Sequence, residues 1–136
     1  MNLFAEIRTV VLEAVARLAG EGVLPGEPAT GGITVEPPRD ANHGDMATNA
    51  AMVLAKWAGV RPRDLAEKLA PLLEADSRID EVTVAGPGFI NLRLSPATWR
   101  SVIGAALAEG AEFGRSAMGA GQRVNVEFVS ANPTGP

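Results

Sequence analysis

Two short runs of alternating residues, joined by Gly86-Pro87-Gly88, constrain the fold of this 136-residue chain more than any other feature. In the second run, one set of alternate positions is apolar and comprises Ile90, Leu92 and Leu94. The other set comprises Phe89, Asn91 and Arg93. Because successive side chains of a strand point to opposite faces, the pattern over 81–94 predicts an antiparallel hairpin with one face for the core.

Apolar residues spaced by three and four positions predict four helices around this hairpin. We expect them at 2–19, at 46–57, at 63–75 and from Pro96 onward. Asp45 and Ser95 are residue types that cap helices, so we expect Asp45 to cap the second helix and Ser95 the fourth. Pro71 is expected to bend or split the third helix.

The predicted buried positions follow the same spacing. For the second helix they are Met46, Ala50, Val53, Leu54 and Trp57, and for the third Leu65, Leu69 and Leu72. For the fourth they are Trp99, Val102, Ile103, Ala106 and Leu107. We predict a two-layer α+β fold, in which helices cover one face of an antiparallel sheet.

The remaining segments complete the predicted organisation. A short strand is expected at 33–36, after a loop rich in proline and glycine. We assign residues 1–115 to one domain and 116–136 to a linker followed by a strand. No apolar run reaches the roughly 18 residues of a membrane span, so we expect a cytoplasmic protein without membrane contact.

Composition excludes several classes of function. The chain has no cysteine, and His43 is its single histidine, so thiolate catalysis and zinc sites built from cysteine and histidine are excluded. His43 and Asp45 could form a catalytic pair, but a loop with a capping aspartate is the favoured interpretation. The net charge of -4 argues against nonspecific binding of nucleic acid, which requires many phosphate contacts.

The polar face of the hairpin is the candidate binding site. A ring stacks on an unpaired base, an amide reads a base edge, and an arginine holds phosphate, which is how proteins recognise RNA loops. The alternative is that Phe89 packs under a loop while Asn91 and Arg93 are solvated. Near the carboxyl end, Ser130 and Asn132 follow a predicted strand, as at the edge of a nucleotide-binding unit or in a frayed tail.

Three blocks of the sequence resemble a known family. Residues 126–136, VEFVSANPTGP, are similar to the segment that precedes the ATP-binding HIGH signature of bacterial arginyl-tRNA synthetases, which are class I enzymes. HGDMATNAAMVLAK at 43–56 and GPGFINLRLS at 86–95 resemble blocks of the amino-terminal additional domain of the same family. The resemblance covers nearly the whole chain and implies that it stops just before the signature.

The resemblance implies a function. The complete enzyme ligates L-arginine to tRNA(Arg) with ATP and Mg²⁺ through arginyl-adenylate, and the additional domain contacts the D-loop at the tRNA elbow. It implies that Phe89 stacks on a D-loop base and that Asn91 hydrogen-bonds the same base. Arg93, on the same strand face, is the third residue that we expect to bind tRNA. Glu127, Ser130 and Asn132 would belong to the arginine pocket.

For the chain itself we expect a monomer with no catalytic residue, no metal and no cofactor. The alternative function is a protein-docking module that never meets RNA, which the net charge of -4 fits slightly better.

Overall fold

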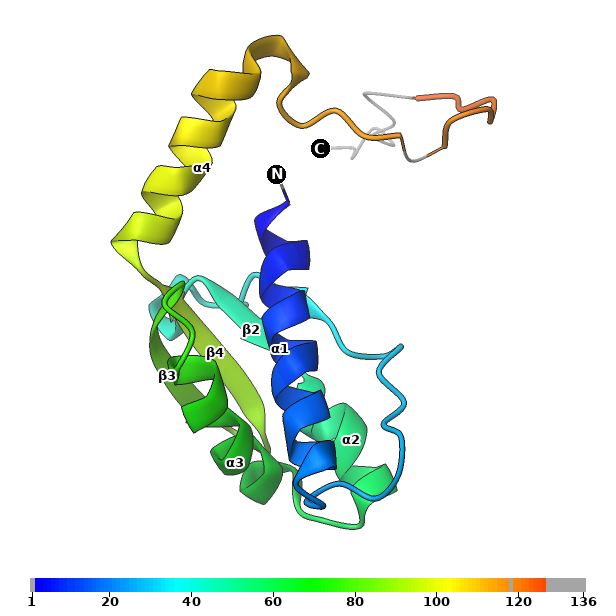
Figure 1. Ribbon diagram of the computed structural model, residues 1–136, viewed down its shortest axis with the longest axis vertical. Coiled ribbons are helices and arrows are strands. Elements are labelled where there is room, and N and C mark those ends of the chain that lie inside the picture. The colour runs from blue at the N-terminus through cyan, green and yellow to red at the C-terminus, as the bar shows by residue number, and fades with distance from the viewer. Residues whose placement is uncertain (1, 118, 127–136) are drawn as a thin grey trace, which may run out of the picture.

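The part of the chain that the structure describes forms a four-stranded sheet and four helices (Figure 1). This computed structural model describes residues 2–117 and 119–126. The helices are α1 (Leu3–Gly20), α2 (Ala50–Ala58), α3 (Pro62–Glu74) and α4 (Pro96–Glu109). The strands are β1 (Val35–Glu36), β2 (Met46–Thr48), β3 (Ile79–Ala85) and β4 (Phe89–Leu94), and two 3-10 turns are η1 (Ala41–His43) and η2 (Gly110–Glu112).

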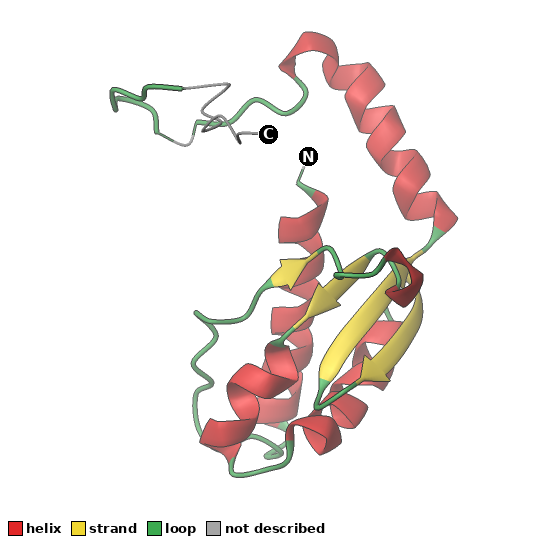
Figure 2. Cartoon of the chain, turned by 180° about the vertical axis from the view of Figure 1, so that it is seen from behind, coloured by secondary structure: helices red, strands yellow, loops and turns green. Residues whose placement is uncertain are grey.

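The sheet has the strand order β1-β2-β4-β3, and every neighbouring pair is antiparallel. The predicted hairpin is confirmed, because β3 pairs with β4 from Ile79 opposite Leu94 to Ala85 opposite Phe89. In Figure 2, α1 and α3 lie behind the sheet and α2 lies at its lower end, while no long helix covers the near face, where only the short η1 lies in front of the strands. The expected two-layer α+β architecture is therefore confirmed.

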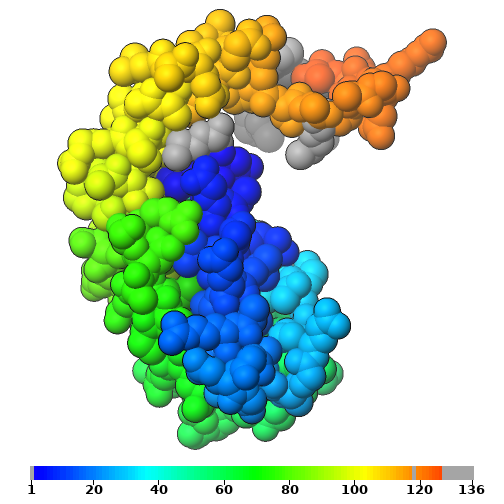
Figure 3. All heavy atoms as spheres, in the orientation of Figure 1, coloured from blue at the N-terminus to red at the C-terminus, as the bar shows by residue number. Residues whose placement is uncertain are grey.

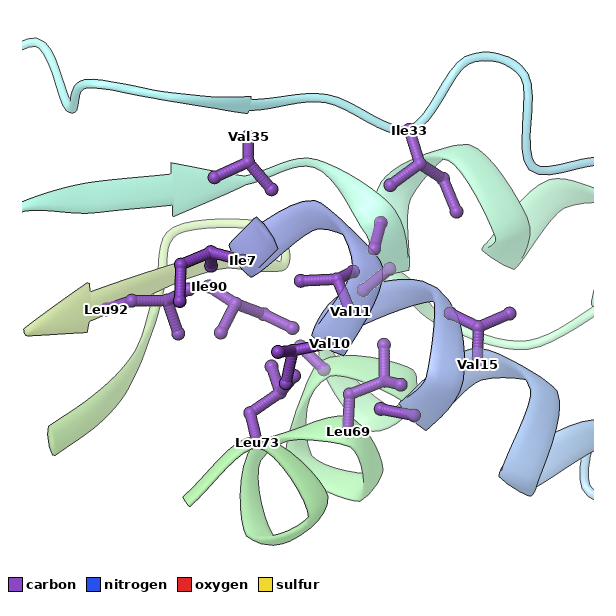
Figure 4. Close-up of a cluster of buried hydrophobic side chains, with 14 of the residues drawn as sticks. Ile7, Val10, Val11, Val15, Ile33, Val35, Leu69, Leu73, Ile90 and Leu92 are labelled. Carbon is purple, nitrogen blue, oxygen red and sulfur yellow. The ribbon is translucent and has the colours of Figure 1, made fainter. Parts of the chain in front are cut away.

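The core lies between this sheet face and the helices (Figure 4). Its fully buried side chains include Ile7, Val11, Leu69, Leu73, Ile90 and Leu92 from α1, α3 and β4, and also Ile33, Met46 and Leu54 from the loop before β1, from β2 and from α2. The apolar set of the hairpin thus enters the core as the alternation predicts. Burying side chains of this size stabilises a fold by about 1.5 to 3 kcal/mol each before conformational entropy is subtracted.

The sequence predicted one helix over 46–57, and this prediction is wrong. Met46–Thr48 is a strand that lies between β1 and β4, and the helix begins only at Ala50. Asp45 does not cap that helix. Its backbone N–H donates to the carbonyl of Leu92 and its carboxylate accepts from the N–H of Leu94, both at 2.8 Å, so Asp45 extends the pairing of β2 with β4.

Helix α3 differs from the prediction in detail. It runs from Pro62 to Glu74 through Pro71 without a break, and Pro71 lies on the exposed side in the last turn. Leu65 and Leu69 are buried as expected, but Leu73 is fully buried and Leu72 only half-buried. The buried face of α3 therefore consists of residues 65, 69 and 73, whereas the sequence predicted 65, 69 and 72.

Helix α4 begins as predicted but does not bury its apolar face. The Ser95 hydroxyl accepts from the N–H of Thr98, which confirms the cap. Trp99, Ile103 and Leu107 are 43%, 61% and 80% exposed, so the predicted buried face is wrong for the described part of the chain. The helix extends away from the sheet and from α1–α3 (Figure 3). Trp57 of α2, also expected inside, is 40% exposed.

The base of α4 is fixed to the body through the backbone of Arg78. The carbonyl of Arg78 accepts from the Ser95 N–H at 2.9 Å and from the Thr98 hydroxyl at 3.1 Å. The Arg78 guanidinium hydrogen-bonds the carboxylate of Asp76 at 2.8 Å and lowers the pKa of that carboxyl below its ordinary value. The junction between α3 and β3 thus supports the start of α4.

Beyond η2 the described residues contain no further regular element. The strand predicted after the linker, within 116–136, is not formed at 123–126, and residues 127–136 lie outside the described residues. None of the helices in the described part of the chain is long and apolar enough to cross a membrane.

Candidate nucleic-acid interface

The helix-free face of the sheet presents the three residues that the alternation selected. Asn91 of β4 is flanked by Ala47 on β2 and Thr83 on β3, which are its partners in the register. Phe89 lies opposite Ala85. Because alanine and threonine are short, they leave space on both sides of β4.

Two hollows open on this face and share Asn91, His43 and Ala85. The larger, of about 580 Å³, is also lined by residues 34 and 36–39, by 47–49 and by Met52 and Phe89. The smaller, of about 290 Å³, is bordered by Asn42, Gly44, Glu81, Thr83 and Arg93. The larger hollow has the size of a small-ligand site, for which about 300 to 1,000 Å³ is usual.

Asn91 forms the floor common to both hollows. Its side chain is 7% exposed, and its amide makes no hydrogen bond with any other described residue. No described side-chain polar atom is both fully buried and without a partner, so the amide remains reachable from the hollows. A primary amide offers two donors and one acceptor, a set that can pair with a base edge.

Phe89 stands at the edge of the larger hollow with 42% of its surface exposed. Its position is set by the preceding turn. Gly88 has a φ of +143°, and a Cβ there would lie 2.8 Å from the carbonyl carbon of Pro62, so the turn packs directly on the start of α3. The ring is thus only partly covered, and its exposed part is free for stacking.

Arg93 is less free than the sequence suggested. Its guanidinium pairs with the Glu81 carboxylate at 3.3 Å, directly across the hairpin. Both side chains are about half exposed, and such pairs contribute roughly 0 to 1 kcal/mol. A phosphate could replace Glu81 at Arg93 at small cost, but Arg93 does not present an uncompensated charge.

The η1 turn forms the wall between the two hollows. The Asp40 carboxylate accepts from the N–H of Asn42 at 2.9 Å and starts the turn, and His43 then faces both hollows. The Asp45 carboxylate accepts from the N–H of Leu94 and makes no hydrogen bond with His43. Sequence reasoning missed residues 36–39, which line the larger hollow, since no local pattern indicates which loop will lie near Phe89 and Asn91.

The described residues include neither a candidate metal centre nor the residues expected around arginine. They contain no group of three histidine, aspartate or glutamate side chains that could hold a metal ion. Glu127, Ser130 and Asn132, the residues expected around arginine, lie outside the described residues.

Comparison with known proteins places this fold among the aminoacyl-tRNA synthetases. The crystal structure of arginyl-tRNA synthetase from Plasmodium falciparum superimposes with a TM-score of 0.60 at 14% identity, over 73% of this chain and 17% of that one. Residues 5–94 match the family model described as arginyl tRNA synthetase N terminal domain, and the chain belongs to this family.

Close relatives are much longer than this chain. It is 65% identical to arginine–tRNA ligase of Paracoccus denitrificans and 62% identical to that of Roseobacter denitrificans, in both cases over all 136 residues. The arginine–tRNA ligase of a Jannaschia species is also 65% identical. The chain spans 23% of the length of the first two relatives and 24% of the third.

Proposed function

We propose that this chain is the tRNA-binding amino-terminal part of an arginine–tRNA ligase. The complete enzyme attaches L-arginine to tRNA(Arg) with ATP and Mg²⁺, through arginyl-adenylate, in the cytoplasm. Family membership and relatives named arginine–tRNA ligase support this assignment. Residues 1–115 then form the tRNA-binding domain and 116–136 lead into the catalytic domain, where Glu127, Ser130 and Asn132 contribute to the arginine pocket.

The proposed ligand of the open face is one unstacked base of the D-loop at the tRNA elbow. The observation that supports it most strongly is the unpartnered amide of Asn91 beside the half-exposed ring of Phe89. Bases in RNA loops can leave the stack, lie on an aromatic ring and hydrogen-bond through their edges. A solvated sheet face needs neither an enclosed amide nor an adjacent exposed ring.

Charge sets the expected strength of this interaction. The net charge of -4 opposes approach to RNA, and Arg93 is already paired with Glu81. We therefore expect the 136-residue chain to bind tRNA(Arg) as a monomer, weakly and only at low salt. Most of the specific binding energy should come from the base at Phe89 and Asn91.

The test is substitution of the stacking ring. Phe89→Ala should weaken binding of tRNA(Arg) by about 1 to 3 kcal/mol, which is the usual contribution of one base stacked on a ring. Phe4→Ala is the matched control, because Phe4 is 39% exposed but lies on α1 in the helical layer. Fluorescence anisotropy of labelled tRNA at low salt measures both variants.

Substitution of Asn91 tests recognition of the base edge separately from stacking on the ring. Asn91→Ala should reduce the preference for tRNA(Arg) over a transcript with an altered D-loop, because the amide is the group that reads the base edge. If Phe89→Ala and Asn91→Ala both bind tRNA(Arg) like the unchanged chain, the hairpin is not the binding site. A docking role toward a protein partner would then be the better explanation of this face.

A further inference from the structure

The larger hollow is lined by one arginine side chain that the proposed base contact does not use. Arg39 lines this hollow together with Phe89 and Asn91. It is exposed and has no hydrogen bond or ion pair with any other described residue. These three groups match the three features of a nucleotide. The ring can stack on the flat base, the amide can hydrogen-bond the polar edge of the base, and the guanidinium can pair with the anionic phosphate.

Most other arginines in the described part of the chain are already neutralised. Ion pairs with nearby carboxylates occupy Arg17, Arg61, Arg63, Arg78, Arg93 and Arg115. Arg8 is used differently, since it donates to the carbonyls of Ile33 and Thr30. Arg39 therefore stands out as an uncompensated guanidinium on the helix-free face.

The backbone that carries Arg39 is held in place on both sides. Before it, the amide of Asn49 accepts from the N–H of Thr34 at 2.9 Å and donates to the carbonyl of Gly32 at 3.1 Å. Pro37 and Pro38 then restrict the chain, because proline fixes φ. After it, Asp40 caps η1. A short, fixed loop presents the guanidinium with little loss of backbone entropy on binding.

We propose that Arg39 binds one RNA phosphate, next to the nucleotide whose base lies on Phe89. This inference rests on the proposed function and adds a phosphate position to that site. The larger hollow has one other charged residue among those that line it, Glu36, so the local balance allows one phosphate but disfavours a run of them. Arginine suits this contact because its planar fork can donate two parallel hydrogen bonds to phosphate oxygens.

The experiment measures how tRNA(Arg) binding to the 136-residue chain depends on salt. Arg39→Gln should weaken binding at low salt and reduce the slope of log K against log salt by about 0.7 to 0.9, the value for one lost phosphate contact. Arg39→Lys should keep the slope, because lysine retains the charge.

Arg100→Gln is the matched control. Arg100 is an exposed arginine of α4 that also makes no ion pair with a described residue, and its removal changes the net charge equally. Arg100→Gln should leave the slope unchanged. An unchanged slope for Arg39→Gln, or the same decrease in both glutamine variants, would overturn the phosphate assignment.

The Phe89→Ala variant separates the two proposals. If Phe89→Ala weakens binding but Arg39→Gln keeps the original slope, the base site stands and the phosphate position is wrong. If Phe89→Ala has no effect, or the unchanged chain shows no binding at low salt, the proposed function fails and the phosphate position fails with it.

Discussion

At the scale of single residues, Gly44 controls how closely the η1 turn approaches β4. Its φ is +114°, in the region that favours glycine, and a Cβ there would lie 2.7 Å from the carbonyl oxygen of Leu92. That oxygen also accepts the N–H of Asp45 at 2.8 Å. The wall between the hollows therefore depends on a residue without a side chain.

Gly44→Ala should lower the free energy of unfolding by about 2 to 4 kcal/mol, because backbone strain and a steric clash act together. Gly26→Ala is the control. Its φ is +58° but a Cβ would meet nothing within 4 Å, so only the left-handed backbone cost of roughly 1 to 2 kcal/mol remains. Urea denaturation of both variants measures the difference, and equal losses would show that Gly44 does not pack closely on β4.

The composition of the candidate site could be predicted from the sequence only in part. Phe89, Asn91 and Arg93 were identified because alternation along one strand is a local property. The enclosure of Asn91 was not predictable, because Ala47 and Thr83 flank it from strands that are distant in sequence. Arg39 carried no local signal either, since its place in the hollow depends on the path of the loop after β1.

At the scale of elements, β2 shows how tertiary pairing overrides local pattern. Methionine and alanine favour helices, and 46–57 has helical spacing throughout, so the sequence alone assigns Met46–Thr48 to a helix. In the fold these residues pair with β1 on one side and with β4 on the other. A strand of three residues is too short to produce a recognisable alternation.

For helix α4 the secondary structure was predicted correctly but its burial was not. Amphipathic spacing indicates an apolar helix face, but it does not reveal whether the same chain supplies a surface to cover that face. The contrast between two leucines tests this. Leu107→Ala should change the stability of the 136-residue chain by less than about 0.5 kcal/mol, since Leu107 is 80% exposed. Leu73→Ala should cost about 2 to 5 kcal/mol, since Leu73 is 0% exposed in the core.

Thermal or urea unfolding of the two leucine variants measures how much each leucine contributes to stability. A loss from Leu107→Ala as large as that from Leu73→Ala would show that α4 folds back on the body of the chain. Trp99 fluorescence provides an independent check, because a ring that is 43% exposed should be accessible to a soluble quencher.

At the scale of the whole molecule, the chain corresponds to a small part of the length of its relatives. It spans 23% of the arginine–tRNA ligase of Paracoccus denitrificans. The described residues offer an open face with a ring, an amide and a free guanidinium but no group that could hold a metal ion. In our proposal this part positions tRNA while the remaining length carries out aminoacylation.

This separation predicts a specific kinetic effect in the full-length ligase. Phe89→Ala should raise the KM for tRNA(Arg) by roughly 5-fold to 150-fold, which corresponds to the loss of about 1 to 3 kcal/mol of stacking. The kcat and the KM for arginine should stay unchanged, because a contact made equally in the ground state and the transition state alters only binding. Steady-state aminoacylation with each substrate varied in turn measures all three constants.

The control in the full-length ligase is again Phe4→Ala, which removes a ring of similar exposure from the opposite layer and should leave every constant unchanged. A fall in kcat for Phe89→Ala with no change in the KM for tRNA(Arg) would contradict the proposal. It would mean that the ring acts on the reacting centre through the fold and not by holding a base, since the loss would then appear only in the transition state.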